Sequence, residues 1–318
     1  MIRDCLKSLR AVAYPSFEVL CVDNGSTDGS ATMIGEEFSE VRLFEQSENL
    51  GFVGANLLAY REAAGDYILF LNSDTTVEPG FLSELVDFME AHPDAGGCEP
   101  KILWMKDPSR LDSVGDYLTW TGLLYHDGYL APDENLDAPF QIFSAKGACM
   151  MFRASVLREV GVFDERYFAY FEETDLCCRV WLSGSKNCFV PDARIHHLLA
   201  GTSRNSDSYL INFHSFKNRI NAMLKNYGMI EAFKVLPVHL TICLGIATVY
   251  ALRGQLRKSR AILEAILWNL LNLRGTWAAR RNVQRKIRQI SDRDLMRTAK
   301  VPVPLTYFLK LYRDYEGV

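Results

Sequence analysis

The sequence predicts an α/β fold in which a mostly parallel central sheet is flanked by helices and followed by a helical C-terminal extension. Short apolar segments alternate with amphipathic segments along residues 1–205, which is the pattern of repeated βαβ units. Residues 67–71 are apolar without alternation, as is typical of a strand buried on both faces of a parallel sheet. We therefore expect this strand in the middle of the sheet.

Charge divides the chain into two parts. Residues 253–300 contain 13 Lys or Arg and 3 Asp or Glu, although the whole chain has a net charge of −4. The hydrophobic fraction of 48% and the charged fraction of 23% are those of a globular protein and exclude a disordered one. We expect an α/β domain over residues 1–205 and a basic, apolar helical region over residues 206–318.

Apolar spacing and turn residues predict the order of the elements in the first part. The expected strands cover residues 17–22, 41–44, 67–71, 143–152 and 188–191, with hairpin-like pieces within 117–129. The expected helices cover residues 2–9, 79–92 and 154–160, a segment ending near residue 64, and a segment that begins near three acidic residues at 172–175. A further amphipathic helix is expected over residues 210–227.

Eight cysteines are scattered among apolar residues, with no C-x-x-C pair. This spacing indicates neither a zinc site nor a disulfide framework. We expect buried thiols in a reducing compartment. No signal peptide opens the sequence.

Residues 235–252 are apolar over about the length of a membrane-spanning helix. Lys234, Pro237 and His239 at its start weaken that interpretation, so a spanning helix and an interfacial or core helix both stay open. The surrounding Arg and Lys clusters have few aromatic residues between them, which favours an anionic membrane surface over nucleic acid. The sequence thus predicts peripheral association with the membrane.

Polar residues follow two of the expected strands. Asp23 follows the strand 17–22 and begins a turn rich in Gly and Ser, whereas Asn72 and Asp74 follow the strand 67–71. Open parallel sheets bind ligands at the carboxyl ends of their strands. At a spacing of two residues, Asn72 and Asp74 offer an amide oxygen and a carboxylate to a hard cation, although ordinary turn formation explains the same residues.

Three carboxylates, Glu172, Glu173 and Asp175, stand at or near the start of an amphipathic helix. The helix dipole favours acids there, and Asp175 is spaced to pair with Arg179, so a structural role stays open. The aromatic residues just before them indicate partial burial, which raises the pKa of a carboxyl group toward useful basicity. The sequence therefore offers a candidate general base in this cluster.

Two adjacent histidines, His196 and His197, follow the last expected strand. Neighbouring side chains on an extended backbone point to opposite faces, so at most one of the two is expected to ligate a metal.

Taken together, residues 22–30, 49–52, 71–74 and 171–179 resemble the motifs of family 2 glycosyltransferases, which have the GT-A fold. The similarity is greatest to bacterial rhamnosyltransferase-like members that build surface polysaccharides. Each motif is weak alone, but four in the same order are specific. The resemblance covers residues 1–205 strongly and the C-terminal region more loosely.

The resemblance implies a donor site and a metal site. Asp23 would contact the nucleoside, and Asp74 would bind a divalent cation, Mn²⁺ or Mg²⁺, on the donor diphosphate. His197 would complete the metal site, and a histidine ligand favours Mn²⁺. The remaining residues expected at the donor are Asn24, Ser26, Asn49, Gly51, Asn56, Asn72 and Ser73.

The same resemblance implies a catalytic and an acceptor side. Glu173 would be the catalytic base, with Glu172 and Asp175 in the same acidic motif. Three further residues would lie at the acceptor side: Lys146, Gly147 and Arg179.

Three features depart from the family pattern. Relatives begin with an apolar strand that holds the base, whereas this sequence begins after it, on the helix 2–9. Glu173 stands where an Asp is usual and is one methylene longer. Leu57 and Leu58 follow Asn56 where relatives often have Asn-Gly.

The resulting prediction is an inverting, metal-dependent glycosyltransferase at the inner face of the cytoplasmic membrane. It would transfer a sugar, with rhamnose as the family-level expectation, from a dTDP- or UDP-sugar to a saccharide or lipid-linked saccharide. A non-catalytic glycan- or partner-binding relative is the alternative, because the first nucleotide-binding strand is missing. A nucleotide-dependent oxidoreductase is disfavoured, because the first β-α turn lacks G-x-G-x-x-G.

Overall fold

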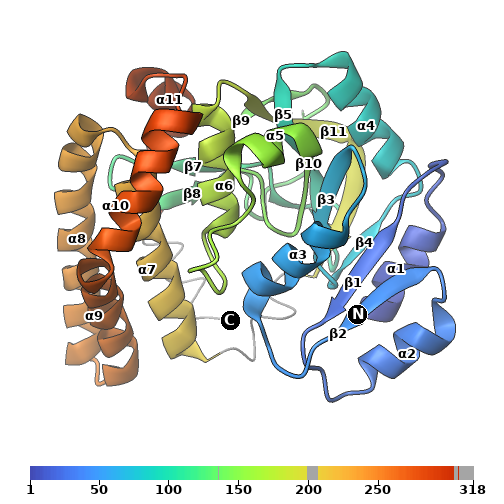
Figure 1. The fold of residues 1–318 in the computed structure, drawn as a ribbon, viewed down its shortest axis with the longest axis horizontal. Coiled ribbons are helices and arrows are strands. Elements are labelled where there is room, and N and C mark those ends of the chain that lie inside the picture. Colours follow the sequence, from blue (N-terminus) through green and yellow to red (C-terminus); the bar gives the residue numbers. More distant parts are fainter. Residues whose placement is uncertain (135, 199–206, 304–306, 308–318) are drawn as a thin grey trace.

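The computed structural model describes residues 1–134, 136–198, 207–303 and 307. Strands and covering helices form one part of the molecule, and the helices that follow residue 207 stand together at the opposite end from α1 and α2 (Figure 1). The predicted α/β class with a helical C-terminal extension is confirmed.

Strands and helices alternate at the start of the chain, as predicted. The elements are α1 (Ile2–Arg10), β1 (Val19–Asp23), α2 (Ser30–Glu37), β2 (Val41–Glu45), α3 (Gly51–Glu62), β3 (Tyr67–Leu71), β4 (Thr75–Val77) and α4 (Phe81–Ala91).

The middle of the chain contains shorter strands and the helix that begins at the predicted acidic cluster. Its elements are β5 (Ala95–Trp104), β6 (Leu111–Ser113), β7 (Asp116–Leu118), β8 (Leu124–His126), β9 (Phe140–Ile142), β10 (Cys149–Arg153), α5 (Ala154–Val160), α6 (Glu172–Leu182) and β11 (Lys186–His197). The predicted hairpin within 117–129 is the antiparallel pair β7–β8.

The C-terminal part is helical. It comprises α7 (Ser208–Asn226), α8 (Met229–Leu252), α9 (Leu256–Leu271), α10 (Leu273–Asn282), the π-helical turn η2 (Val283–Ile287) and α11 (Asp292–Ala299). The predicted boundary between residues 205 and 206 falls in 199–206, outside the described residues. Met223 of α7 and Val235 of α8 belong to the same apolar cluster as α6, so the two parts share a core.

The sheet is mixed rather than mostly parallel, and β3 is not in its middle. The strand order is β3-β10-β5-β11-β4, with β10 antiparallel to both β3 and β5 and with β5 parallel to β11. Within the described residues, β1 and β2 form a separate parallel pair. Only Phe70 of β3 is fully buried, whereas every residue but the last is buried in both β5 and β10. An apolar run indicates that a strand packs against covering elements, but not its place in the strand order.

Strand β11 continues well beyond the predicted segment 188–191. The pairing with β5 shifts between Val190 and Arg194, and the strand then continues to His197. Pro191 suggested that the strand ends there. The shift in pairing between Val190 and Arg194 instead accommodates the proline inside the strand. As a result, His196 and His197 lie opposite Thr76 and Thr75 of β4, immediately after Asp74.

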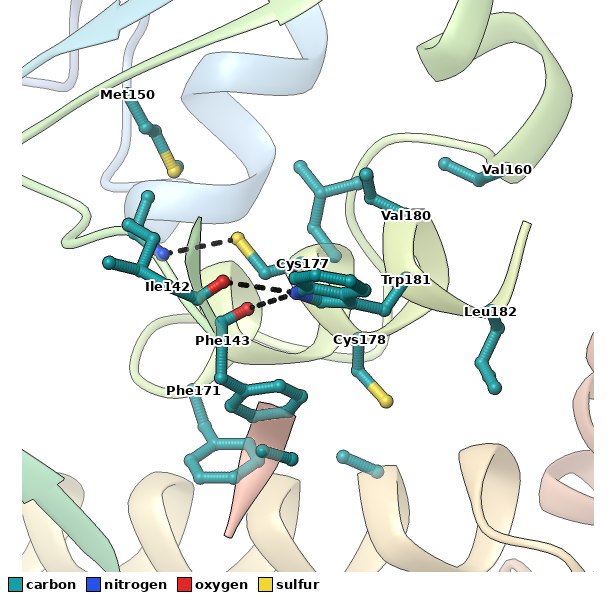
Figure 2. Packing of buried hydrophobic residues seen from close by; sticks show 14 of the residues in the cluster. Ile142, Phe143, Met150, Val160, Phe171, Cys177, Cys178, Val180, Trp181 and Leu182 are labelled. Atoms are coloured by element: carbon teal, nitrogen blue, oxygen red, sulfur yellow. Dashed lines mark hydrogen bonds between the residues drawn. The ribbon is translucent and has the colours of Figure 1, made fainter. Parts of the chain in front are cut away.

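Hydrogen bonds from Trp181 hold α6 against residues 142–143, which precede Lys146 in the chain. Its indole Nε1 donates to the carbonyl oxygens of Ile142 and Phe143, at 3.1 Å each, as Figure 2 shows. The Cys177 Sγ, one turn earlier, accepts from the backbone N–H of Ala145 at 3.4 Å. All eight cysteines are free thiols.

We expect Trp181→Phe to lower the free energy of unfolding by about 1–3 kcal/mol, because two buried carbonyl groups lose their donor. Chemical denaturation followed by circular dichroism measures this. The matched control, Trp120→Phe, changes a ring that is 59% exposed and should stay within about 0.5 kcal/mol of the wild type. Equal losses in the two variants would contradict the anchoring role.

Candidate functional site

Charged side chains of alternating sign connect the residue before β4, strands β11 and β6, and the segment before β10. His197 Nε2 lies 3.4 Å from Asp74 Oδ1, and His197 Nδ1 lies 2.6 Å from Asp112 Oδ2. The other oxygen of Asp112 accepts a hydrogen bond from Lys146 Nζ. Asp112 is fully buried. Its two cationic partners offset the unfavourable free energy of burying a carboxylate. The structure therefore brings three predicted site residues together through Asp112.

The pKa shifts in this chain of charges follow from the pairing. Burial lowers the pKa of His197, but its hydrogen bonds to Asp112 and Asp74 outweigh this and raise that pKa to about 9. Burial acts to raise the pKa of Asp112, but Lys146 and His197 hold it below its usual range. Burial likewise disfavours the charged form of Lys146, whereas the carboxylates of Asp112 and Asp116 raise its pKa. In the free protein, His197 is therefore an imidazolium between two carboxylates.

The same arrangement fits a divalent cation. Asp74 Oδ1 and His197 Nε2 face one another and would replace the shared proton by the metal. A carboxylate on the second ring nitrogen, here Asp112, is the partner that orients a metal-bound histidine. The described residues contain no group of three or more such ligands. The other coordination positions would fall to water and to a ligand such as a diphosphate, as is common for Mg²⁺.

Glu173 lies beside Lys146 and Gly147. A Cβ atom added at Gly147 would be 4.0 Å from Glu173 Cγ, an ordinary van der Waals distance, so Gly147 is a direct neighbour of this side chain. Glu173 is half-buried. Burial is the main cause that raises its pKa to about 7, and the carboxylate of Asp116 adds to the effect. A carboxylate with this pKa is well matched to accept a proton near neutral pH.

The residue before it, Glu172, has a different environment. Its side chain is buried, and Oε2 has no hydrogen-bond partner in the described part of the chain. Burial, reinforced by the charge of Glu173, raises its pKa well above the usual range. Burial and the neighbouring charge thus favour the protonated form of Glu172 relative to an ordinary glutamate.

The turn before α6 is strained. Tyr170 and Phe171 have φ values of 72° and 71°, in the left-handed region that residues other than glycine seldom adopt. The buried side chain of Asn218, from α7, donates to the carbonyls of Ala169 and Tyr170 at 2.9 and 2.7 Å. These bonds hold the strained turn and thereby set the position of Glu173.

Asp175 and Arg179 lie in a buried network between α6 and α7. Asp175 accepts from Arg179 Nε at 3.1 Å, from Lys225 Nζ at 2.9 Å and from Asn226 Nδ2 at 2.8 Å. The remaining nitrogens of Arg179 donate to the backbone carbonyls of residues 160–162. Both side chains are thus fully engaged within the protein and connect the two helices.

The residues predicted for the donor converge at the end of β1. Asn24 accepts from the backbone N–H of Leu50 at 2.7 Å and donates to Asn49 Oδ1 at 3.0 Å. Asn49 in turn accepts from the N–H of Gly51 at 2.8 Å. Asp23, which is buried, accepts from the N–H of Ser26 at 3.1 Å. These bonds join the turn after β1 to the start of α3.

The start of α3 also contacts the turn that precedes α6. Gly51 has φ of +73°, and a Cβ there would lie 2.4 Å from the carbonyl oxygen of Phe168, so only glycine fits. Asn56 donates to the Phe52 carbonyl of its own helix at 2.8 Å. Asn72 is held through its backbone, whose N–H donates to Ala148 at 2.9 Å, and Ser73 is exposed.

Reasoning from the sequence missed the residues that connect the predicted ones. Asp112 and Glu99 are acids inside buried strands, and no local pattern in the Leu-Asp-Ser of β6 or the Cys-Glu-Pro-Lys of β5 indicates a partnered carboxylate. Glu99 accepts from the backbone N–H groups of Lys146 and, at 3.0 Å, Gly115. Asp116 pairs with His126 at 2.6 Å across the β7–β8 hairpin, which the sequence located without assigning either residue.

Comparison with known proteins identifies the class. The fold is that of GT-A glycosyltransferases: S. aureus TarS 1-349 in complex with UDP-GlcNAc superposes with a TM-score of 0.57 at 17% identity, over 94% of this chain and 86% of TarS. Mannosyltransferase PcManGT from Pyrobaculum calidifontis, in complex with GDP-Man and Mn²⁺, superposes with a TM-score of 0.52 at 17% identity, over 85% of this chain and 83% of that one.

Residues 1–161 match Glycosyl transferase family 2, and the chain belongs to this family. The N-acetylglucosaminyl-diphospho-decaprenol L-rhamnosyltransferase of Mycobacterium tuberculosis is 30% identical over 241 residues, which are 66% of this chain and 76% of that protein. Rhamnosyltransferase WbbL of Escherichia coli K12 is 27% identical over 161 residues, 49% of this chain and 61% of WbbL. The predicted resemblance is confirmed: the protein is a rhamnosyltransferase-like family 2 glycosyltransferase, and its activity is sugar transfer in polysaccharide synthesis.

We expect Lys225→Met to lower the free energy of unfolding by about 3–5 kcal/mol, because it removes the cation shared by the buried carboxylate of Asp175 and the partly buried carboxylate of Asp164. Lys186→Met is the control, since its ion pair with Asp94 is exposed and should contribute below about 1 kcal/mol. Urea denaturation compares the two. A loss in Lys225→Met no larger than the control's would show that the network does not couple α6 to α7.

Proposed function

We propose that the chain is an inverting, metal-dependent glycosyltransferase that moves a sugar from a nucleotide-diphosphate donor to a saccharide acceptor. The observation that carries this proposal is that a short series of paired side chains connects a candidate cation site to a candidate general base. Asp74 and His197 lie at one end, and Glu173 lies beside Lys146 and Gly147 at the other. Asp112 contacts both His197 and Lys146, so it connects the proposed cation site to the segment next to Glu173.

The donor side would use the residues that meet at the end of β1 and the acidic residue after β3. Asp23, Asn24 and Ser26 would contact the nucleoside, with Asn49, Gly51, Asn56, Asn72 and Ser73 around the diphosphate and sugar. Asp74 and His197 would hold Mn²⁺ or Mg²⁺, which supplies charge neutralisation for the departing diphosphate. Asp112 keeps the Nδ1 proton of His197 in place, which directs Nε2 toward the cation.

The acceptor side would use Glu173 as general base. Its carboxylate takes the proton of an acceptor hydroxyl while that oxygen forms a bond to the anomeric carbon of the sugar. The bond from that carbon to the diphosphate oxygen breaks, and its electron pair leaves with the diphosphate. Attack from the face opposite the leaving group inverts the anomeric configuration. Lys146 and Gly147 would line the acceptor side, next to Glu173.

Glu172, Asp175 and Arg179 would act by position rather than by contact with substrate. Asp175 and Arg179 fix α6 against α7, as their complete set of partners supports. Glu172 is buried and its pKa lies well above the usual range, which supports a role inside the protein rather than at the substrate. The predicted catalytic and acceptor roles of these three residues therefore become positioning roles in this proposal.

The names of the relatives suggest the substrates. The Mycobacterium tuberculosis protein is named as an L-rhamnosyltransferase for N-acetylglucosaminyl-diphospho-decaprenol. By analogy, we assign a rhamnosyl nucleotide, with dTDP or UDP as the nucleotide, and a saccharide carried on a lipid diphosphate. An acceptor carried on a membrane lipid would require the enzyme at the membrane, and we assign it to the inner face of the cytoplasmic membrane.

A second candidate is a glycan- or partner-binding relative without turnover. The observation that favours it is the separation of β1 and β2 from the larger sheet in the described residues, at the place where the donor residues meet. Donor binding together with transfer would exclude this candidate, whereas donor binding without transfer would support it.

We expect UDP or dTDP to bind in a Mn²⁺-dependent manner, and Asp74→Ala to weaken that binding about 10–100-fold, because one of two metal-holding side chains is lost. Isothermal titration with and without Mn²⁺ measures this. Asp87→Ala, on the exposed face of α4, is the control and should bind as the wild type does. Unchanged Mn²⁺-dependent binding in Asp74→Ala would contradict the proposed metal site.

We expect the rate of transfer to rise with pH through about 7 and then level off. Burial raises the pKa of Glu173 to that value, so the base is protonated and inactive below it. Glu173→Gln should lower kcat about 10²–10⁴-fold and leave donor binding intact. Glu165→Gln, at an exposed site, is the control and should keep the profile of the wild type. A profile that keeps its inflection in Glu173→Gln would assign the titration to another group.

A further inference from the structure

Helix α8 has one buried face and one exposed apolar face. Every fourth residue from Glu231 to Ala247 is buried against the protein. The opposite face carries large apolar side chains, with Ile230 at 73%, Phe233 at 72% and Leu252 at 83% exposed. No other described residues cover this face, although its side chains are of the kind normally buried in a protein interior.

Helices α9 and α10 extend this surface. Helix α9 packs against α8 and contributes Leu256, Leu263, Leu267 and Leu271, whereas α10 contributes Leu273 and Trp277. The three helices stand at the end of the molecule away from α1 and α2 (Figure 1). Thirteen of the seventeen exposed large hydrophobic side chains in the described part of the chain lie between Met229 and Trp277. A concentration of this kind marks an interaction surface rather than ordinary scatter.

Two threonines on the exposed side of α8 direct their hydroxyl groups toward the backbone of their own helix. Thr241 donates from its hydroxyl to the Pro237 carbonyl at 2.9 Å, and Thr248 donates to the Leu244 carbonyl at 2.8 Å. Both hydroxyls are thereby satisfied without water, as an apolar environment requires.

A basic groove adjoins the apolar surface where α8 begins. It has a volume of about 370 Å³ and is lined by Gly228, Met229, Trp277, Arg280, Arg281, Gln284 and Arg285. Arg280 is buried and donates to the carbonyls of Leu224 and Tyr227, so it fastens α10 to α7. Arg281 and Arg285 are exposed, and their planar guanidinium groups suit phosphate oxygens. Trp277, half-exposed at the edge, is a residue favoured at membrane interfaces.

We propose that the exposed faces of α8, α9 and α10, together with the Arg281–Arg285 groove, dock the enzyme on an anionic lipid bilayer. We name this surface the docking face. Its leucines, Phe233 and Trp277 enter the boundary of the acyl chains, and Arg281 and Arg285 bind lipid phosphates. The inference rests on the proposed function, because an acceptor carried on a membrane lipid requires the enzyme at that surface.

The structure favours a helix that lies on the bilayer over one that crosses it. α8 has the length and apolarity to span a membrane. However, its buried face carries Glu231, which is paired with Lys300, and His239, whose Nδ1 lies 2.9 Å from the Thr121 carbonyl. Crossing the bilayer would separate these groups from their partners within hydrocarbon.

The apolar part of the proposal is tested by flotation of the full chain with vesicles of phosphatidylcholine and phosphatidylglycerol. Leu244→Glu/Leu267→Glu should lose at least about tenfold in vesicle binding, because two inserted side chains become charged. Phe17→Glu/Trp120→Glu is the matched control, since both of its side chains are exposed outside the docking face. Equal binding by the wild type and the α8–α9 variant would overturn the proposal.

The electrostatic part is tested by Arg281→Glu/Arg285→Glu. This variant should lose about tenfold or more in binding to vesicles with phosphatidylglycerol, and it should no longer distinguish them from phosphatidylcholine alone. Lys7→Glu/Lys106→Glu makes the same change in net charge elsewhere on the surface and should bind as the wild type does. Equal losses of vesicle binding in the two variants would show a general effect of net charge and would overturn the proposed role of the Arg281–Arg285 groove.

Two further measurements separate this inference from its competitors. Resistance to carbonate extraction would show a spanning helix, and a dimer in light scattering that Leu244→Glu/Leu267→Glu dissociates would show a second copy on the docking face. Either result would overturn the proposal. Titration with UDP and Mn²⁺ in each variant reports the proposed function separately: donor binding should survive in all of them. Absence of donor binding in a wild type that still binds vesicles would count against the proposed function alone.

Discussion

The buried carboxylate of Asp112 is the group on which the arrangement of the site depends. It holds the Nδ1 side of His197 and the ammonium group of Lys146 at the same time, and each of these residues leads to a different part of the chemistry. Without Asp112, two cations would face each other in a poorly solvated interior, and neither would keep its position. One interior charge thus couples the predicted cation site to the region of the predicted base.

The C-terminal helices have two separable physical roles. On their inner side, Asn218 and Lys225 of α7 hold the strained turn before α6 and the buried face of α6 itself. On their outer side, α8 to α10 carry apolar and basic groups that the rest of the protein does not cover. The extension therefore belongs to the catalytic architecture as much as to the proposed contact with the membrane, because both depend on the same helices.

The local features of the sequence predicted local structure well. The strand at 67–71 and the helix at 154–160 have the predicted bounds, and the acidic cluster does begin a helix at Glu172. Errors arose where long-range pairing decides. The strand 67–71 pairs with β10 alone in the described residues and therefore ends the strand order, and β11 extends to His197 because its pairing with β5 resumes after an irregularity. Neither event leaves a periodic signal in the segment concerned.

The sequence by itself determined the family and the residue types of the site, because turn glycines, strand-end acids and a helix-start acidic cluster are local patterns with definite chemistry. Only the tertiary structure decided which of those residues are available for chemistry. Glu173 and Asp175 are two positions apart on one helix, yet one is half-buried with a pKa near 7 and the other is enclosed by Arg179, Lys225 and Asn226. The difference is physical: the pKa and the contacts of a carboxyl group depend on the charges and burial that distant segments bring to it, and the chain order does not contain those distances.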